Sequence, residues 1–220
     1  MAASPVRFVR FRPDEAIDVE ELRRQRVLCG WGEEKVEFWR DQVRRGVKNL
    51  YWVFPSAADE PLPWTGFEPC NFDTARSGPP PPDLSFQPLG HVSLDWEDSD
   101  NDESLCDRDA GKVTLATFFL LLSQQGKGYG STVMKEMEDM AKRDLSATSI
   151  TLNTVDGEFA VQPWWWERQG VPYSPNRRVN EKWYERLGYV AYKRGIPRYP
   201  GKTVSGEDIL LEAVFMEKKV

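Results

Sequence analysis

Residues 114–131 read TLATFFLLLSQQGKGYGS, and this stretch decides the fold. It opens with an almost wholly apolar run, which predicts a buried strand. A glycine-rich turn carrying Lys127 follows, and an amphipathic helix begins directly after it. Glycines let backbone N–H groups approach an anion closely, and a helix N-terminus adds positive potential. The order strand, glycine turn, helix therefore predicts a binding site for a phosphorylated cofactor.

The spacing of the glycines excludes two common nucleotide sites. A dinucleotide site requires G-x-G-x-x-G, but the third position after Gly126 and Gly128 is Ser131. A nucleoside-triphosphate loop requires G-x-x-x-x-G-K followed by Ser or Thr, and the sequence contains no such string. Each glycine costs roughly 0.5–1 kcal/mol of backbone entropy relative to alanine, so three alternating glycines exceed what a simple turn needs.

The remaining pattern, Gln125-x-x-Gly128-x-Gly130, resembles the Q/R-x-x-G-x-G/A signature of the GNAT superfamily of acyl-CoA-dependent N-acetyltransferases. The resemblance implies acetyl-CoA as the cofactor, with its pyrophosphate on the loop and its pantetheine arm paired with the backbone of the preceding strand. The N–H of Leu120 would face the thioester carbonyl. The expected cofactor contacts are Phe118, Phe119, Leu120, Gln125, Gly126, Lys127, Gly128, Tyr129, Gly130 and Ser131, with an exposed loop lysine as the alternative for Lys127. Asn180 is a further candidate, although it stands where the family usually has a small residue. Core packing is the alternative for the two phenylalanine side chains.

A second motif spans residues 183–189, WYERLGY, and is similar to the Y-x-x-x-G-F/Y segment of the same family. The resemblance implies that Tyr184 protonates the departing CoA thiolate. A phenol of pKa ~10 and a thiol of pKa ~8.5 are close enough for that transfer. Gly188 is suited to a helix C-cap. The alternative for Tyr184, next to Trp183, is a place in the core.

A general base is harder to assign from the sequence. An alkylamine of pKa ~10.4 is only about one part in a thousand neutral at pH 7, so a base or a water chain must assist. Some lysine-acetylating relatives use a glutamate on the cofactor strand, but the matching residue here is Thr114. The candidates are Asp95 and Glu97, at the end of the third strand, with His91 behind them. Solvated acids and a structural histidine are the alternatives.

Three adjacent tryptophans cannot all be buried on one side of a regular element, which draws attention to residues 163–168, PWWWER. Aromatic faces beside an acid suit an organic cation. The predicted substrate contacts are Trp164, Trp165, Trp166 and Glu167. A packed lid without substrate contact is the alternative.

Hydrophobic periodicity predicts an α/β fold, and the order of elements resembles the GNAT architecture: a mixed, mostly antiparallel central sheet of about seven strands flanked by helices. We expect one domain over residues 1–220. Strands are predicted at 6–12, 50–54, 89–96, 112–122, 148–154, 189–193 and 209–217, and helices at 14–29, 33–46, 129–143 and near 179–187. Phe38 and Trp39 are expected on the apolar side of the second helix.

Residues 55–88, rich in proline, read as an extended or mobile insertion without a core element. Residues 95–109 read as a solvated acidic loop, and residues 156–178 as an aromatic loop.

Composition narrows the class of partner. The net charge of -6 and pI near 5.1 argue against nucleic-acid and anionic-membrane partners. No apolar run suggests a signal peptide or a membrane span. Three cysteines without metal-ligand spacing predict no metal site and a reduced, cytoplasmic compartment. A homodimer is compatible with these features.

The resemblance implies an enzyme that transfers an acetyl group from acetyl-CoA to a primary amine, expected to be that of a small molecule, by direct attack in a ternary complex. A protein lysine or N-terminal acetyltransferase is a first alternative, disfavoured by Thr114 and by long loops that would crowd a peptide groove. A non-catalytic acyl-CoA-binding protein is a second, disfavoured by the intact glycine loop together with Tyr184.

Overall fold

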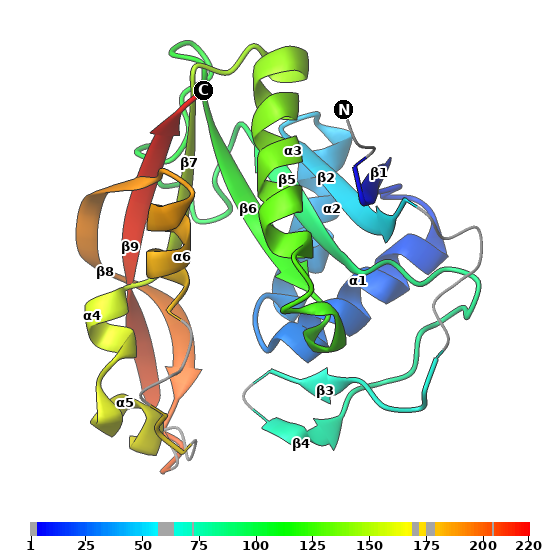
Figure 1. Ribbon diagram of the computed structural model, residues 1–220, viewed down its shortest axis with the longest axis vertical. Helices are drawn as coiled ribbons and strands as arrows, with labels where there is room; N and C mark the ends of the chain where they lie inside the picture. The colour runs from blue at the N-terminus through cyan, green and yellow to red at the C-terminus, as the bar shows by residue number, and fades with distance from the viewer. Residues whose placement is uncertain (1–3, 57–63, 72, 169–171, 175–178, 204) are drawn as a thin grey trace. The chain divides into compact units, whose positions relative to one another are not determined.

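The computed structural model describes residues 4–56, 64–71, 73–168, 172–174, 179–203 and 205–220 (Figure 1). The chain divides into two compact units, Met1–Ala147 and Thr148–Val220. A single domain over the whole chain stays a prediction.

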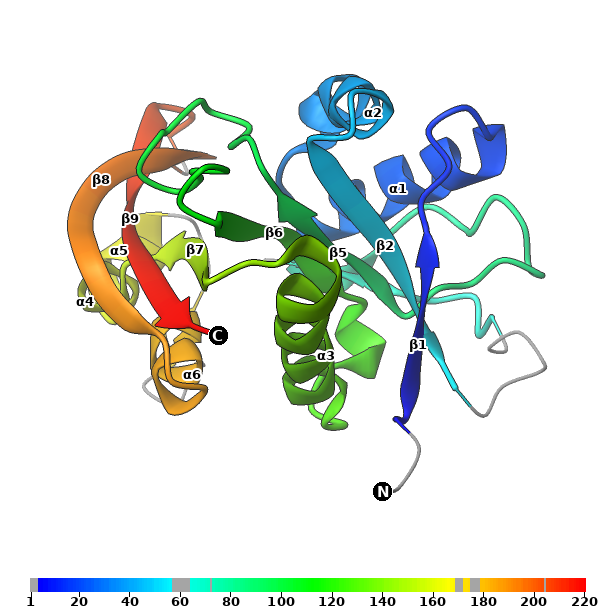
Figure 2. The ribbon, with the colours of Figure 1, turned by 90° about the horizontal axis from the view of Figure 1, so that it is seen from above.

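The first unit is built on four antiparallel strands in the order β1-β2-β5-β6. Two helices cover one face of these strands and a third covers the other (Figure 2). The strands are β1 (Val6–Arg10), β2 (Lys48–Pro55), β5 (Gly90–Asp95) and β6 (Lys112–Leu120). The helices are α1 (Ala16–Cys29), α2 (Val36–Arg44) and α3 (Tyr129–Leu145), with single 3₁₀ turns η1 (Glu33–Lys35) and η2 (Leu122–Gln124).

Helices α3 and α1 bury their inner faces by different means. Helix α3 buries an apolar stripe that includes Val133 and Met137, as its periodicity predicts. Helix α1 buries charged and amide groups, which is tolerable only where they are hydrogen-bonded. Glu21 accepts from Arg24 Nε at 2.7 Å and from Gln25 Nε2 at 2.8 Å, so these buried groups satisfy one another.

The proline-rich segment contains a hairpin, so the prediction of no core element there was wrong. Strands β3 (Pro69–Cys70) and β4 (Asp73–Ser77) pair antiparallel. Cys70 is buried in one cluster with Leu28 and Phe119. The N–H of Asn71 donates to the Leu28 carbonyl at 2.7 Å. At Gly78 an added Cβ would lie 2.0 Å from Leu28 Cδ2, so only glycine fits. Backbone contacts with the end of α1 fix this segment, and composition does not register such contacts.

The second unit holds three antiparallel strands in the order β7-β9-β8. Strand β9 lies between the other two and is fully buried at residues 213–216. The strands are β7 (Ser149–Val155), β8 (Val190–Lys202) and β9 (Asp208–Lys219). The short helices are α4 (Gly157–Ala160), α5 (Pro163–Arg168) and α6 (Asn180–Arg186).

A buried carboxylate joins the helices of this unit. Glu181, at the start of α6, accepts from the Gly157 N–H at 2.7 Å and pairs with Arg194 of β8. A Cβ at Gly157 would lie 2.4 Å from Glu181 Oε2, so the close approach requires glycine. Asp156 caps α4 by accepting from the Glu158 N–H at 2.9 Å.

The α/β fold class with seven main strands is confirmed. Three local predictions were wrong. Residues 163–168 are helical rather than loop, and β8 continues to Lys202 because it is an edge strand, where Pro197 and Pro200 are tolerated. Phe38 is 41 % exposed, whereas Trp39 is buried as expected. Parts of the predicted aromatic loop, residues 169–171 and 175–178, lie outside the described residues.

Helices in the described ranges are all too short or too polar to span a membrane. The same ranges contain no group of three His, Cys, Asp or Glu side chains that could hold a metal ion.

Candidate functional site

The glycine loop leads from β6 through η2 into α3. Gly126 and Gly128 have φ of 79° and 88°, the left-handed region that glycine adopts without strain. Gly128 is the N-cap of α3, where no side chain of a described residue accepts from the first turn. That first turn also carries no acid. The N–H groups of residues 129–131 thus begin a 17-residue helix without a competing carboxylate, a geometry that fits an anion such as the pyrophosphate of CoA.

Two side chains of the loop anchor it. Gln125 Nε2 donates to the Leu120 carbonyl at 3.0 Å, which ties the loop back to the end of β6. Lys127 Nζ donates to Gln124 Oε1 at 2.9 Å across the exposed turn. In this arrangement Gln125 positions the backbone, and the exposed backbone of residues 126–128 is what a ligand would meet.

A third anchor comes from the proline-rich segment and was missed by sequence reasoning. Glu68 is buried, and its carboxylate accepts from the Ser123 N–H at 3.0 Å and from Ser123 Oγ at 2.7 Å. The two residues are 55 positions apart, so no local pattern could have paired them. The hairpin is therefore fastened to the turn that precedes the glycine loop.

Strand β6 directs its backbone groups to both edges. Leu121 donates its N–H to the Leu89 carbonyl at 2.8 Å, toward β5. Backbone groups of successive strand residues alternate in direction, so the Leu120 N–H and carbonyl face the opposite edge. The predicted oxyanion donor thus points away from β5. The Phe119 side chain is buried in the core, which supports the packing alternative for it, and Phe118 is half-buried.

A bulge interrupts the pairing of β5 with β6 at Thr117. His91 pairs with Phe119 and Ser93 with Ala116, so β6 has one residue more than β5 between these pairs. Thr117 has φ of 49°, a conformation that is uncommon for a β-branched residue. Its Oγ1 lies 2.8 Å from Ser93 Oγ.

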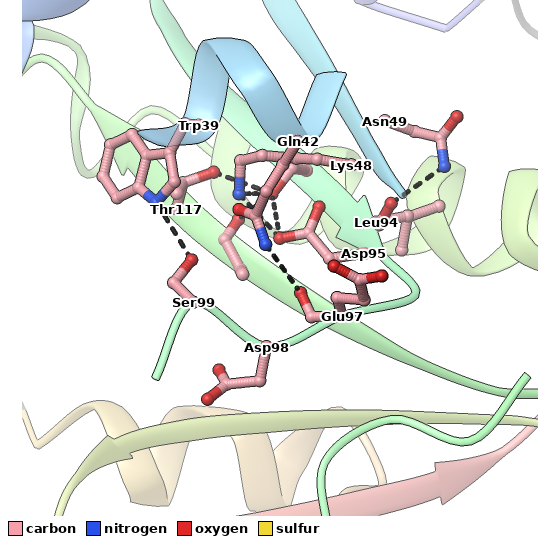
Figure 3. Close-up of polar contacts among 12 residues, drawn as sticks. Trp39, Gln42, Lys48, Asn49, Leu94, Asp95, Glu97, Asp98, Ser99 and Thr117 are labelled. Carbon is pink, nitrogen blue, oxygen red and sulfur yellow. Dashed lines mark hydrogen bonds and ion pairs between the residues drawn. The ribbon is translucent and has the colours of Figure 1, made fainter. Parts of the chain in front are cut away.

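Asp95, a predicted base candidate, lies in a buried ion pair (Figure 3). Its Oδ2 accepts from Lys48 Nζ at 2.6 Å and from Ser93 Oγ at 3.0 Å. The side chains of Lys48 and Asp95 are 0 % and 1 % exposed. Asp95 Oδ1 is buried and has no hydrogen-bond partner among the residues that the structure describes. The expectation of a solvated acid at this position was wrong, because β5 is buried on both of its faces.

Burial shifts both partners of this pair toward neutrality. It raises the pKa of Asp95, although the Lys48 ammonium opposes that shift. Burial likewise lowers the pKa of Lys48, opposed by Asp95. Asp95 is therefore a stronger base than a carboxylate in water.

The other two base candidates are placed differently. His91 is fully buried between Gln25 Oε1, 2.8 Å from its Nδ1, and Arg26 Nη1, 3.4 Å from its Nε2. Burial and the charge of Arg26 hold its pKa well below 6.5, so it is neutral and structural, as the alternative reading has it. Glu97 is exposed and pairs with Arg45 at 3.0 Å. Thr114, at the position of the relatives' glutamate, is buried.

Tyr184 belongs to the second unit, on α6. Its ring centroid lies 4.8 Å from that of Trp183 and 5.9 Å from that of Tyr189. Burial raises the pKa of the Tyr184 phenol, which makes the neutral form the stable one. Gly188, with φ of 92°, ends the helix as expected, and its N–H donates to the Glu185 carbonyl at 2.9 Å. Asn180 is exposed at the first position of α6.

The tryptophans of α5 divide into inner and outer residues. Trp165 is buried against Phe159, with ring centroids 5.0 Å apart. Trp166 is buried too, and its Nε1 donates to the Ala160 carbonyl at 2.7 Å. Trp164 is 43 % exposed, and Glu167 is exposed. Packing accounts for Trp165 and Trp166, so the outer pair is what an acceptor could contact.

Comparison with known proteins places the fold. No protein-family model matches the chain, and no curated protein does. A candidate acetyltransferase from Acinetobacter baylyi is 12% identical, with a TM-score of 0.54 over 98% of this chain and 93% of that one. A chimera of the Vibrio cholerae spermidine N-acetyltransferase SpeG is 10% identical, with a TM-score of 0.59 over 98% and 96%. A dodecameric structure of the Vibrio cholerae enzyme, 10% identical, gives 0.55 over 99% and 95%.

The chain thus shares its fold with these acetyltransferase structures over almost its whole length, which confirms the GNAT-like fold that the sequence predicts.

Proposed function

We propose that the protein transfers an acetyl group from acetyl-CoA to the primary amine of a small molecule, by direct attack in a ternary complex. The observation that carries this proposal is the glycine loop: two left-handed, exposed glycines lead into a long helix whose N-terminus has no side-chain cap and no acid among the described residues. Such a terminus stabilises an anion and leaves the backbone open to it. The fold, shared with acetyltransferases, supports the reaction class.

In this proposal the residues have separate roles. The backbone of 126–131 binds the pyrophosphate, and the backbone of 118–120 binds the pantetheine arm. The Leu120 N–H, directed away from β5, stabilises the oxyanion. Tyr184 supplies the proton to the thiolate. Acetyl-CoA, when bound, supplies the activated acetyl group.

A small polyamine is the first acceptor to test. Similar structures include spermidine N-acetyltransferases, and the chain's net charge of -6 favours a cationic substrate. Trp164 and Glu167, both exposed on α5, are the proposed amine contacts. A cytoplasmic location and a homodimer complete the proposal.

Calorimetry with CoA tests the cofactor site. In Gly128→Val a β-branched side chain stands in space that is now open, in a left-handed conformation, and we expect at least a tenfold loss of CoA affinity. Gly206→Val is the matched control, because Gly206 has a φ of 85° and equally open surroundings but lies in the β8–β9 turn. Equal CoA affinity in wild type and Gly128→Val would remove the central claim.

One observation favours a second function. Burial raises the pKa of the Tyr184 phenol, which makes it a weaker acid, and burial also encloses the Asp95 carboxylate. A protein that binds acyl-CoA without turnover needs neither a strong acid nor an accessible base. CoA binding combined with no thiol release over a broad panel of amines would establish this alternative. Acetylation of peptides in preference to free amines would instead favour a protein acetyltransferase.

A further inference from the structure

The polar cluster behind the bulge of β6 forms a continuous hydrogen-bonded chain. Thr117 Oγ1 lies 2.8 Å from Ser93 Oγ, and Ser93 Oγ lies 3.0 Å from Asp95 Oδ2. Lys48 Nζ donates to Asp95 Oδ2 at 2.6 Å (Figure 3) and to Ser93 Oγ at 3.1 Å. Thr117 is half-buried, whereas the other three residues are buried. The chain therefore runs from a partly exposed residue to an enclosed carboxylate.

The hydrogen bonds have one consistent direction. The Ser93 hydroxyl has one proton and two acceptors within reach, Asp95 Oδ2 at 3.0 Å and the Ala116 carbonyl at 3.2 Å. In the relay it donates to the carboxylate, the nearer acceptor. Ser93 Oγ then accepts from Thr117, whose hydroxyl can in turn accept from a group outside the cluster. A proton entering at Thr117 thus has a path of two hydroxyl transfers to Asp95.

Three features of the cluster are costly and call for an explanation. A β-branched residue at φ 49° costs of order 1–3 kcal/mol, and such strain gathers at functional sites. A buried ion pair adds little net stability compared with apolar residues of the same volume. Moreover, Asp95 Oδ1 is buried with no partner in the part of the chain that the structure describes. Packing alone explains none of the three.

We infer that Thr117, Ser93 and Asp95 form a proton relay that deprotonates the acceptor amine. The inference rests on the proposed function and names the base that the sequence left open. An N–H bond of the substrate ammonium breaks as its proton passes to a bridging water, and an O–H bond of that water breaks as a proton passes on to Thr117 Oγ1. The Thr117 proton passes to Ser93, the Ser93 proton passes to Asp95 Oδ2, and the neutral amine is left to attack. After product release the proton returns to solvent along the same hydroxyls.

The distances along β6 are compatible with this role. Leu120, the proposed oxyanion donor, lies three residues beyond Thr117, roughly 10 Å at about 3.3 Å per residue. The scissile carbonyl, the amine and one bridging water span such a gap. Lys48 Nζ, 2.6 Å from Asp95 Oδ2, holds that carboxylate in place.

Thr117→Val tests the relay, because valine keeps the branched shape and removes only the hydroxyl. With acetyl-CoA and spermidine we expect kcat to fall by about 10²-fold while the KM for acetyl-CoA changes less than about twofold. Thr117→Ser restores the hydroxyl and should recover most of kcat. Ser99→Ala is the matched control, since Ser99 accepts from Trp39 in the same region but lies outside the chain of hydroxyls.

A substitution at Ser93, between Thr117 and Asp95, distinguishes a relay from proton transfer to Thr117 alone. Ser93→Ala leaves Thr117 in place and breaks its path to Asp95, so kcat should fall as in Thr117→Val. The double variant should lose no more than either single one, because one broken link already interrupts the path.

If wild type acetylates spermidine and Thr117→Val keeps its kcat, the relay is wrong and the proposed function stands. If Ser93→Ala keeps kcat while Thr117→Val loses it, Thr117 acts alone and the relay is also overturned. CoA binding without acetylation of any amine overturns both proposals.

Discussion

Tyr184 and Gln125 show how differently two motif residues are placed in their surroundings. Gln125 is exposed and holds its own loop to the end of β6 through the Leu120 carbonyl. Tyr184 is enclosed by aromatic rings, so its ring is a packing unit whatever its hydroxyl does. At this scale the sequence predicts backbone requirements well: Gly126, Gly128 and Gly188 all have the left-handed φ that their motifs require. It does not predict partners such as Lys48 and Asp95, which are 47 positions apart.

Tyr184→Phe separates the ring from its proton. Ring packing is retained, so we expect thermal stability and acetyl-CoA binding to stay close to wild type. If the phenol is the acid, kcat should fall by roughly 10²–10⁴-fold in steady-state thiol-release assays. Tyr189→Phe, which removes the hydroxyl of the neighbouring tyrosine, is the matched control. Unchanged turnover in Tyr184→Phe would assign this residue to the core.

Among the elements, those with strong periodicity were predicted and those held by distant contacts were not. Helix α3 and strand β6 follow from their own residues, because an apolar stripe or run determines each. The β3–β4 hairpin depends on Leu28 and Ser123, which no local pattern connects to it. Helix α5 forms although it contains three tryptophans, because Phe159 and the Ala160 carbonyl receive two of them.

Substitutions on α5 should therefore have opposite effects on its two sides. Trp165→Ala empties a buried position and should lower the free energy of unfolding by about 3–5 kcal/mol, measured by denaturant titration. Trp164→Ala removes an exposed ring and should change stability by less than about 1 kcal/mol. If the outer side contacts the amine, Trp164→Ala raises the acceptor KM severalfold and leaves the KM for acetyl-CoA unchanged. An unaltered acceptor KM would exclude α5 from the acceptor site.

For the molecule as a whole, buried ionisable groups link stability to pH. His91 is kept neutral by burial and by the neighbouring charges of Arg26 and Lys48, and its ring centroid lies 5.9 Å from those of Trp52 and Phe119. Below its ordinary pKa near 6.5 the unfolded chain binds a proton there that the folded protein does not. Stability from this group is thus complete above pH 6.5 and is lost as the pH falls. The raised pKa values of Glu21 and Asp95 act in the opposite sense at lower pH.

Comparison with His91→Asn isolates the histidine, since the carboxyl contributions are common to both proteins. Between pH 6.5 and 5 the wild type should lose up to about 1.4 kcal/mol per pH unit more than the variant. Urea titrations at a series of pH values measure this difference. Parallel pH profiles for the two proteins would mean that His91 has the same pKa in the folded and unfolded states, which would contradict this prediction.

The left-handed backbone conformation of Thr117 lowers stability, while its hydroxyl is needed for turnover through the proposed relay. Glycine or asparagine adopts its backbone conformation at lower cost, so either would be selected in a search for heat-resistant variants. Both lack the hydroxyl that the relay needs. Laboratory evolution for stability and for activity would then diverge at this one position, and a design method that scores only folding energy would replace the residue at which the proposed relay begins.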